Sequence, residues 1–96
     1  AIDDEEKTAL TYSLSQNYPN PFNPTTTITY AIPEIAKVQL TIYNILGQKV
    51  TQLVNQNKKA GRYQVIWDAQ NAPSGLYFVT FKANSKVFTK KMMLLK

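Results

Sequence analysis

The 96-residue sequence contains neither cysteine nor histidine. This absence excludes disulfide bridges, zinc fingers, cysteine or histidine nucleophiles and metal sites built on imidazole. The sequence also lacks an apolar run near the roughly 20 residues that a membrane-spanning helix needs. Its acidic start is unlike a secretory signal, which begins with positive charge. We therefore expect any secretory signal to lie on a longer precursor, and we expect no cofactor.

Acidic residues are scarce beyond the first few positions. Residues 8–96 hold ten lysine or arginine residues against two acidic ones, a net charge of +8. The lysines are spread out, and no glycine-rich phosphate loop or RNA-recognition motif accompanies them. We expect no nucleic-acid partner. The basic body predicts at most a weak, diffuse attraction to anionic lipopolysaccharide.

The two remaining carboxylates, Glu34 and Asp68, offer little chemistry. They lie at the ends of different expected strands, so they do not form a catalytic carboxyl pair. Asp68 precedes a loop and could ligate calcium, but hard cations usually gather several carboxylates. A cap that accepts hydrogen bonds from loop N–H groups is the simpler interpretation. The sequence predicts no enzyme and no metal site.

Apolar residues alternate with polar ones along most of the chain. Gly47 is expected at positive φ in one turn, and Asn84-Ser85 is expected as a two-residue hairpin turn. Residues 56–61 are polar and predict a loop. The alternation predicts strands at 27–32, 37–43, 49–55, 62–68, 76–82 and 86–95. Short strands with turns every 8–12 residues indicate an all-β, immunoglobulin-like antiparallel sandwich of about seven strands.

Aromatic side chains fall on both faces of these strands. Trp67 shares the inner phase of its strand with Tyr63 and Val65, so we expect it to be buried between the sheets. Three other aromatics, Tyr12, Tyr43 and Phe78, fall on the outer faces of their strands. A glycan-binding platform could lie there.

A proline-rich segment precedes the first long strand. It consists of Asn17, Tyr18, Pro19, Asn20, Pro21, Phe22, Asn23 and Pro24. Proline fixes φ and biases the preceding residue away from helix, so we expect a stiff strap that is either extended or turning. Tyr18 and Phe22 are expected to anchor this strap on the core.

The last strand changes character at Lys91, after which it is apolar on both faces. Its final residues are Lys90, Lys91, Met92, Met93, Leu94, Leu95 and Lys96. A central strand would explain this pattern. An edge strand would explain it equally well, and its free backbone could pair with a receptor or with another copy of the chain.

In five ordered blocks the chain resembles the C-terminal sorting domain, type A, of proteins exported by the type IX, or Por, secretion system. The blocks are the strap through Ile28, Ile42–Val50 with Gly47, Ala60-Gly61 with Trp67-Asp68, Ser74–Phe78 with Gly75 and Tyr77, and Lys90–Lys96. The resemblance spans about residues 13–96. The immunoglobulin-like module of flagellar hook-capping proteins shares the middle blocks.

The resemblance implies a seven-stranded sandwich at residues 13–96, with residues 1–12 a linker from an upstream cargo domain. It implies a natural C-terminus at Lys96, and recognition of Lys90–Lys96 by the outer-membrane translocon. A sortase-like peptidase would cut within residues 1–12 and could join the secreted or surface cargo to lipopolysaccharide. A structural or adhesive immunoglobulin-like module is the alternative, and a glycan-binding module is a weaker one.

Overall fold

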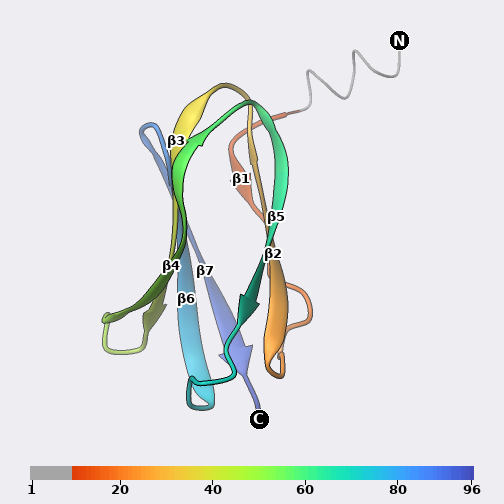
Figure 1. The fold of residues 1–96 in the computed structure, drawn as a ribbon, viewed down its shortest axis with the longest axis vertical. Helices are drawn as coiled ribbons and strands as arrows, with labels where there is room; N and C mark the ends of the chain where they lie inside the picture. The colour runs from red at the N-terminus through yellow and green to blue at the C-terminus, as the bar shows by residue number, and fades with distance from the viewer. Residues whose placement is uncertain (1–9) are drawn as a thin grey trace.

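The computed structural model describes residues 10–96, which form seven strands in two sheets (Figure 1). The strands are β1 (Ser13–Leu14), β2 (Thr25–Ile32), β3 (Ala36–Asn44), β4 (Lys49–Lys58), β5 (Gly61–Asp68), β6 (Gly75–Ala83) and β7 (Lys86–Leu94). The predicted all-β sandwich is confirmed. Within these described residues there is no helix that could span a membrane.

The two sheets have the strand orders β1-β2-β5 and β4-β3-β6-β7, and every neighbouring pair is antiparallel. β7 is therefore an edge strand, which decides between the two alternatives for the end of the chain. β4 is the opposite edge of the larger sheet, and the chain crosses from it to the edge of the smaller sheet through residues 59–60.

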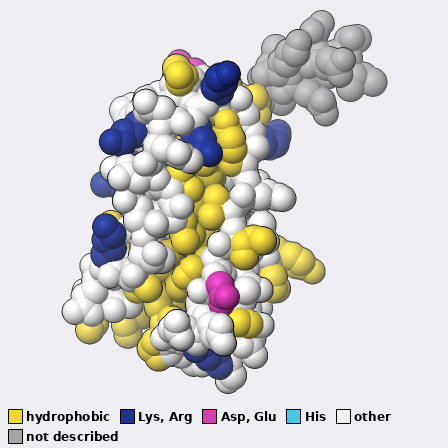
Figure 2. All heavy atoms as spheres, viewed as in Figure 1, with side chains coloured by type: hydrophobic (Ala, Val, Ile, Leu, Met, Phe, Trp, Pro, Cys, Tyr) yellow, Lys and Arg dark blue, Asp and Glu magenta, His cyan; other side chains and the backbone are white. Residues whose placement is uncertain are grey.

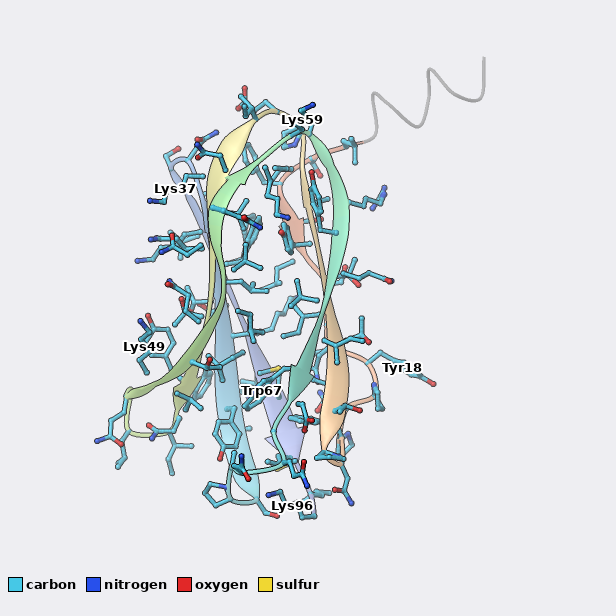
Figure 3. All side chains as sticks on the ribbon, viewed as in Figure 1. Tyr18, Lys37, Lys49, Lys59, Trp67 and Lys96 are labelled. Carbon is cyan, nitrogen blue, oxygen red and sulfur yellow. The ribbon has the colours of Figure 1, made fainter. Side chains whose placement is uncertain are left out.

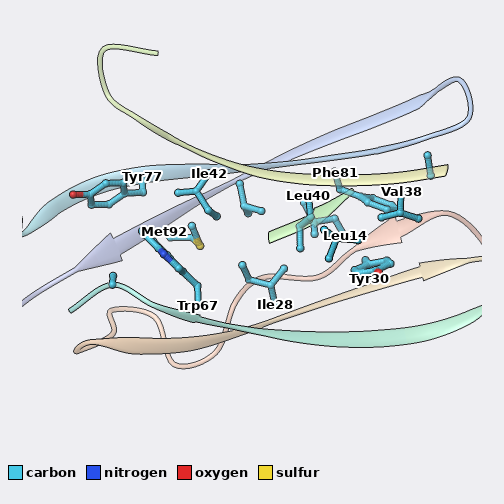
Figure 4. Packing of buried hydrophobic residues seen from close by; sticks show 14 of the residues in the cluster. Leu14, Ile28, Tyr30, Val38, Leu40, Ile42, Trp67, Tyr77, Phe81 and Met92 are labelled. Atoms are coloured by element: carbon cyan, nitrogen blue, oxygen red, sulfur yellow. The ribbon is translucent and has the colours of Figure 1, made fainter. Parts of the chain in front are cut away.

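The core lies between the sheets and is built from alternate residues of the strands (Figure 4). Its fully buried members include Ile28, Val38, Leu40, Ile42, Val79, Phe81, Met92 and Leu94. Trp67 is 5% exposed, and its ring lies 5.6 Å from Phe22 and 5.3 Å, edge-on, from Tyr77. The prediction for Trp67 is thus confirmed, and Tyr63 and Val65 are half-buried on the same face.

Turn residues adopt the expected conformations. Gly47 has φ +79° and Asn84 has φ +54°, both in the left-handed region. The side chain of Asn44 also holds the first of these turns, because its Oδ1 accepts hydrogen bonds from the N–H groups of Leu46 and Gln48. Asp68 Oδ1 accepts a hydrogen bond from Gln70 N at 3.0 Å, which is the capping role expected for it.

The predicted loop at residues 56–61 is wrong. β4 continues to Lys58, which pairs with Ala36, and β5 begins at Gly61. The polar composition of residues 55–58 does not prevent strand formation, because a neighbouring strand supplies their backbone hydrogen bonds. The connection between the two sheets is therefore only residues 59–60.

Candidate functional site

The strap Asn17–Pro24 anchors on the core through one of its two aromatics. Phe22 is 2% exposed, whereas Tyr18 is 80% exposed and points away from the sandwich (Figure 3). The expectation that Tyr18 is a core anchor is therefore wrong. Its backbone forms a bridge with Thr27, and side chains alternate along extended backbone, so the inward position falls on Asn17 instead.

A buried polar network holds the start of the strap. Asn17 Nδ2 donates to Thr26 Oγ1 at 2.9 Å and to Pro19 O at 3.2 Å. Thr26 Oγ1 in turn donates to Pro19 O at 2.8 Å. Asn17 and Thr26 are both buried, and buried polar groups cost little only when they are hydrogen-bonded. The network therefore fixes the path of the strap against β2.

The rest of the strap covers the outer edge of β7. Phe22 N donates to Met93 O at 2.9 Å, and Leu95 N donates to Phe22 O at 3.0 Å. Met93 N donates to Asn20 Oδ1 at 3.0 Å, and Gln16 Nε2 donates to Lys91 O at 2.7 Å. An added strand would find these backbone groups occupied. The free backbone expected of an edge strand is absent from the stretch between Lys91 O and Leu95 N.

The seven candidate recognition residues differ in what they present to a partner. Met92 and Leu94 are fully buried in the core. Lys90 and Met93 are half-buried, and the exposed ones are Lys91, Leu95 and Lys96. Lys96 is tied to a neighbouring loop, because its N–H donates to Ser74 Oγ and its Nζ to Gln70 O. A partner of the folded domain would therefore meet mainly the three exposed side chains.

Segments far apart in the sequence meet at this end of the sandwich. We call it the end face, made of residues 18–23, 44–48, 69–74 and 93–96. The pairing of Asn44 with Tyr77 joins the turn at 44–48 to the start of β6. The pairing of Gly75 with Leu94 joins the start of β6 to the end of β7. A shallow pocket of about 300 Å³ separates the turn at 44–46 from residues 73–77, and Ile45 and Leu46 are exposed on its rim. The end face thus combines exposed apolar side chains with lysine.

The other predicted motif residues divide between this end and the opposite one. Trp67 and Tyr77 pack behind the end face, and Tyr77 OH donates to Pro73 O at 2.6 Å. Gly75, with φ +150°, begins β6 beside Leu94. Gly61 lies at the far end, where β5 pairs with Ile32 at the end of β2. This block is therefore divided: Gly61 lies away from the end face, whereas Trp67 packs behind it.

The aromatics considered for glycan binding do not form one platform. Tyr43 and Phe78 pair across β3 and β6. Tyr12 lies by the far end, where its hydroxyl donates to Glu34 Oε2 and accepts from Asn84 Nδ2. The hydrogen bond to the Glu34 carboxylate is the main reason that the pKa of Tyr12 is raised. The linker expected at residues 1–12 lies largely outside the described residues.

Sequence reasoning missed Gln16 and assigned no role to Ser74, which lies in one of the five blocks. Gln16 and Ser74 hold the backbone of β7 and of Lys96 by their side chains. Each is a polar residue in an irregular segment, and its partner lies 75 or 22 positions away. No local pattern signals such contacts.

Comparison with known proteins places these features in context. The family model of the secretion system C-terminal sorting domain matches residues 16–95. No curated protein matches the chain significantly. Among solved structures, the chain resembles PorZ, described as an essential bacterial surface component of the type IX secretion system of Porphyromonas gingivalis. The TM-score is 0.60 at 20% identity, and the match covers 88% of this chain and 11% of PorZ, so the likeness concerns the fold.

Proposed function

This chain belongs to the family of type IX secretion C-terminal sorting domains, and we propose that it is a non-catalytic signal that directs a larger cargo through the outer-membrane translocon. Membership of the family associates the chain with type IX secretion and with a secreted or cell-surface cargo. The observation that carries the proposal is the end face, where the strap and residues 74–78 lie beside the last residues of β7 and the turn at 44–46 lies beside residues 73–77.

The end face supports recognition because its geometry is fixed before a partner arrives. Hydrogen bonds from Gln16 and from the strap hold the backbone of residues 91–95, and the buried side chains of Met92 and Leu94 hold it from beneath. Little conformational entropy is then lost on binding. In this proposal the translocon reads the exposed Lys91, Leu95 and Lys96, with Ile45 and Leu46 as apolar neighbours.

The fate of the cargo after export forms a second part of the proposal. A sortase-like peptidase would cut ahead of the folded sandwich, within residues 1–12, and could transfer the cargo to lipopolysaccharide. The strap supports this order of events, because it binds the start of the domain to β7, so a cut ahead of it would leave the sandwich intact. The domain itself would meet lipopolysaccharide only through diffuse positive charge.

A reporter fusion tests the sorting function. The whole chain is fused behind a signal peptide and a folded reporter, in a host with a working type IX system and in a translocon-deficient strain. The reporter should reach the surface or medium in the first host and stay in the periplasm of the second. If the reporter is exported equally well without the chain, the sorting function is contradicted. A structural or adhesive module would then take its place.

A further inference from the structure

An apolar groove opens on the side of the sandwich where β4 and β5 form the two sheet edges. Figure 2 shows a band of hydrophobic side chains along this side of the molecule. The groove has a volume of about 580 Å³, and its apolar lining includes Val50, Leu53, Ile66, Trp67, Ala72 and Tyr77. Ile66 is 67% exposed on β5. Trp67 and Tyr77 belong to the core, so the groove reaches the core from this side.

The β4 edge of the groove is irregular. Leu40 pairs with Val54 but Thr41 pairs with Gln52, so Leu53 is an extra residue. A second shift, between Ile42 and Tyr43, leaves Val50 as an extra residue. Both extra residues line the groove. Bulges disturb the ladder and increase the local twist, which makes an edge a poor template for another strand.

The β5 edge is regular by contrast. Its register with β2 runs without a shift from Asp68 opposite Thr25 to Gly61 opposite Ile32. Ala69 N donates to Pro24 O, while the backbone of Thr27 bonds to Tyr18 on the other side of β2. In antiparallel pairing, successive residues direct their backbone N–H and C=O groups to opposite sides of the strand. The odd residues of β5 therefore bond to β2, and the backbone groups of the even residues point away from β2.

The outward backbone groups of β5 belong to Arg62, Gln64, Ile66 and Asp68. Within residues 10–96, no backbone hydrogen bond outside the β2–β5 ladder reaches them. This edge carries a cation at one end, Arg62, and an anion at the other, Asp68. A strand that pairs here in the antiparallel sense should present the opposite charge at each end. β5 of another molecule has that order of charges.

We propose that a second copy of this chain occupies the edge, with β5 antiparallel to β5 and Arg62 opposite Asp68 of the second copy. A two-fold axis relates the copies, so this contact occurs twice. Gln64 then lies opposite Ile66 of the second copy, and all four even positions form hydrogen-bonded pairs. A shift by two residues in either direction would separate Arg62 from Asp68 of the second copy.

The same register matches the inner faces of the two strands. Tyr63 comes opposite Trp67 of the second copy, and Val65 comes opposite Val65 of the second copy. Tyr63 and Val65 are only half-buried in the single chain, so pairing removes further apolar area from water. Cross-strand pairs of aromatic, β-branched and opposite-charge residues each stabilise a sheet.

The shape of the groove suits a two-fold arrangement. Residues 59–60 hold β4 and β5 together at one end, and the strands diverge toward the other (Figure 1). The two-fold axis turns the narrow end of one copy toward the wide end of the other. Lys58 and Lys59 of one copy then approach Asp68 of the second copy.

The net charge of the chains opposes association, so we expect a weak dimer.

The first test is the oligomeric state of the purified chain. Sedimentation equilibrium from about 10 µM to about 1 mM should show a reversible dimer, since small edge interfaces bind weakly. The amide protons of Gln64 and Ile66 should exchange more slowly as concentration rises. Ile66→Lys should weaken association at least about tenfold. The matched control Val87→Lys, at a position 59% exposed on β7, should leave it unchanged.

The second test is specific to the register. Arg62→Glu and Asp68→Arg should each weaken self-association about tenfold or more, because attraction becomes repulsion at both ends. An equimolar mixture of the two variants should restore a heterodimer, in which every opposed pair is again attractive. Arg62→Glu leaves the bond between Asp68 and Gln70 intact, so it remains informative if Asp68→Arg unfolds.

Four results would overturn the proposal. They are a monomer at every concentration, a dimer that Arg62→Glu does not weaken, a mixture of folded variants that stays monomeric, and a dimer that Val87→Lys disrupts. Thermal unfolding of each variant confirms that it is folded. The measurements need no secretion host, so their outcome is independent of the export test.

Discussion

Phe22 forms a parallel backbone bridge with Leu94, which lies 72 residues later in the sequence. Phe22 N donates to Met93 O, and Phe22 O accepts from Leu95 N. The ring of Phe22 enters the core against Trp67. The strap and the end of β7 are therefore one structural unit, and changes in the strap should alter the region proposed for recognition.

The two aromatics of the strap should differ sharply in their effect on stability. Phe22→Ala removes a buried ring and should lower the free energy of unfolding by about 3–5 kcal/mol. Tyr18→Ala is the matched control, because the side chain of Tyr18 is solvated. This variant should change the free energy of unfolding by about 0.5 kcal/mol or less. Urea denaturation measures both values. Equal losses for the two variants would contradict this packing.

A local opening of the end face should follow loss of the Asn20 side chain. Asn20→Ala removes the acceptor for Met93 N and should cost about 1 kcal/mol. The amide proton of Met93 should exchange faster, while amides in the centre of β3 keep their protection. Asn20→Asp retains an oxygen acceptor and should restore the slow exchange. Unchanged exchange at Met93 in Asn20→Ala would show that the contact is not maintained in solution.

The stability of the protein should fall at high pH because of Tyr30. Its hydroxyl is buried, and none of residues 10–96 hydrogen-bonds to it. Burial, with a smaller contribution from Tyr63, raises the pKa of Tyr30 from 10.0 to about 12. A pKa that is higher in the folded state gives a stability contribution that is complete below pH 10 and is lost as pH rises toward 12.

Tyr30→Phe tests this explanation. The variant should show a shallower loss of unfolding free energy between pH 10 and 12, because one raised pKa is gone. At neutral pH it should be as stable as the parent or more stable by up to about 1 kcal/mol, since a buried hydroxyl without a partner is removed. Denaturant titrations at several pH values measure both effects. An unchanged slope would assign the alkaline loss to other groups.

Charge reversal among the exposed candidate recognition residues at the end of β7 should reduce export in the reporter fusion. Lys91→Glu combined with Lys96→Glu reverses two exposed charges there, and a charge-sensitive receptor contact would be lost. The matched control is Lys82→Glu with Lys86→Glu, two exposed lysines at the opposite end of the β6–β7 hairpin. Surface measurements of reporter activity should show a defect for the first pair only. Equal export by both pairs would argue against recognition through these lysines.

Binding to lipopolysaccharide should be weak and should depend on salt. Residues 8–96 carry a net charge of +8 without a strong cluster, so attraction is diffuse. Co-sedimentation with lipopolysaccharide should decline steadily as salt rises from about 50 mM to about 500 mM. Uncharged lipid vesicles serve as the control. Saturable binding that resists salt would contradict the diffuse-charge model and indicate a defined site.

Local alternation along the chain was enough to assign the buried face of most strands. Alternation with period two is a local property, so Val38, Leu40 and Ile42 could be assigned to the core before any strand was placed. Trp67 follows the same rule. The turns at Gly47 and Asn84 were also predictable, because positive φ depends on the residue itself.

Which strands lie at the edges, and what covers them, depends on how the whole chain packs. The phase of β7 is the same in a central or an edge strand, so the pattern could not show that Gln16, Asn20 and Phe22 pair with its outer side. The bulges that turn Val50 and Leu53 toward the groove depend on the register with β3, which local alternation does not encode. Contacts between distant segments follow from how the two sheets pack. Each segment alone is compatible with several such arrangements.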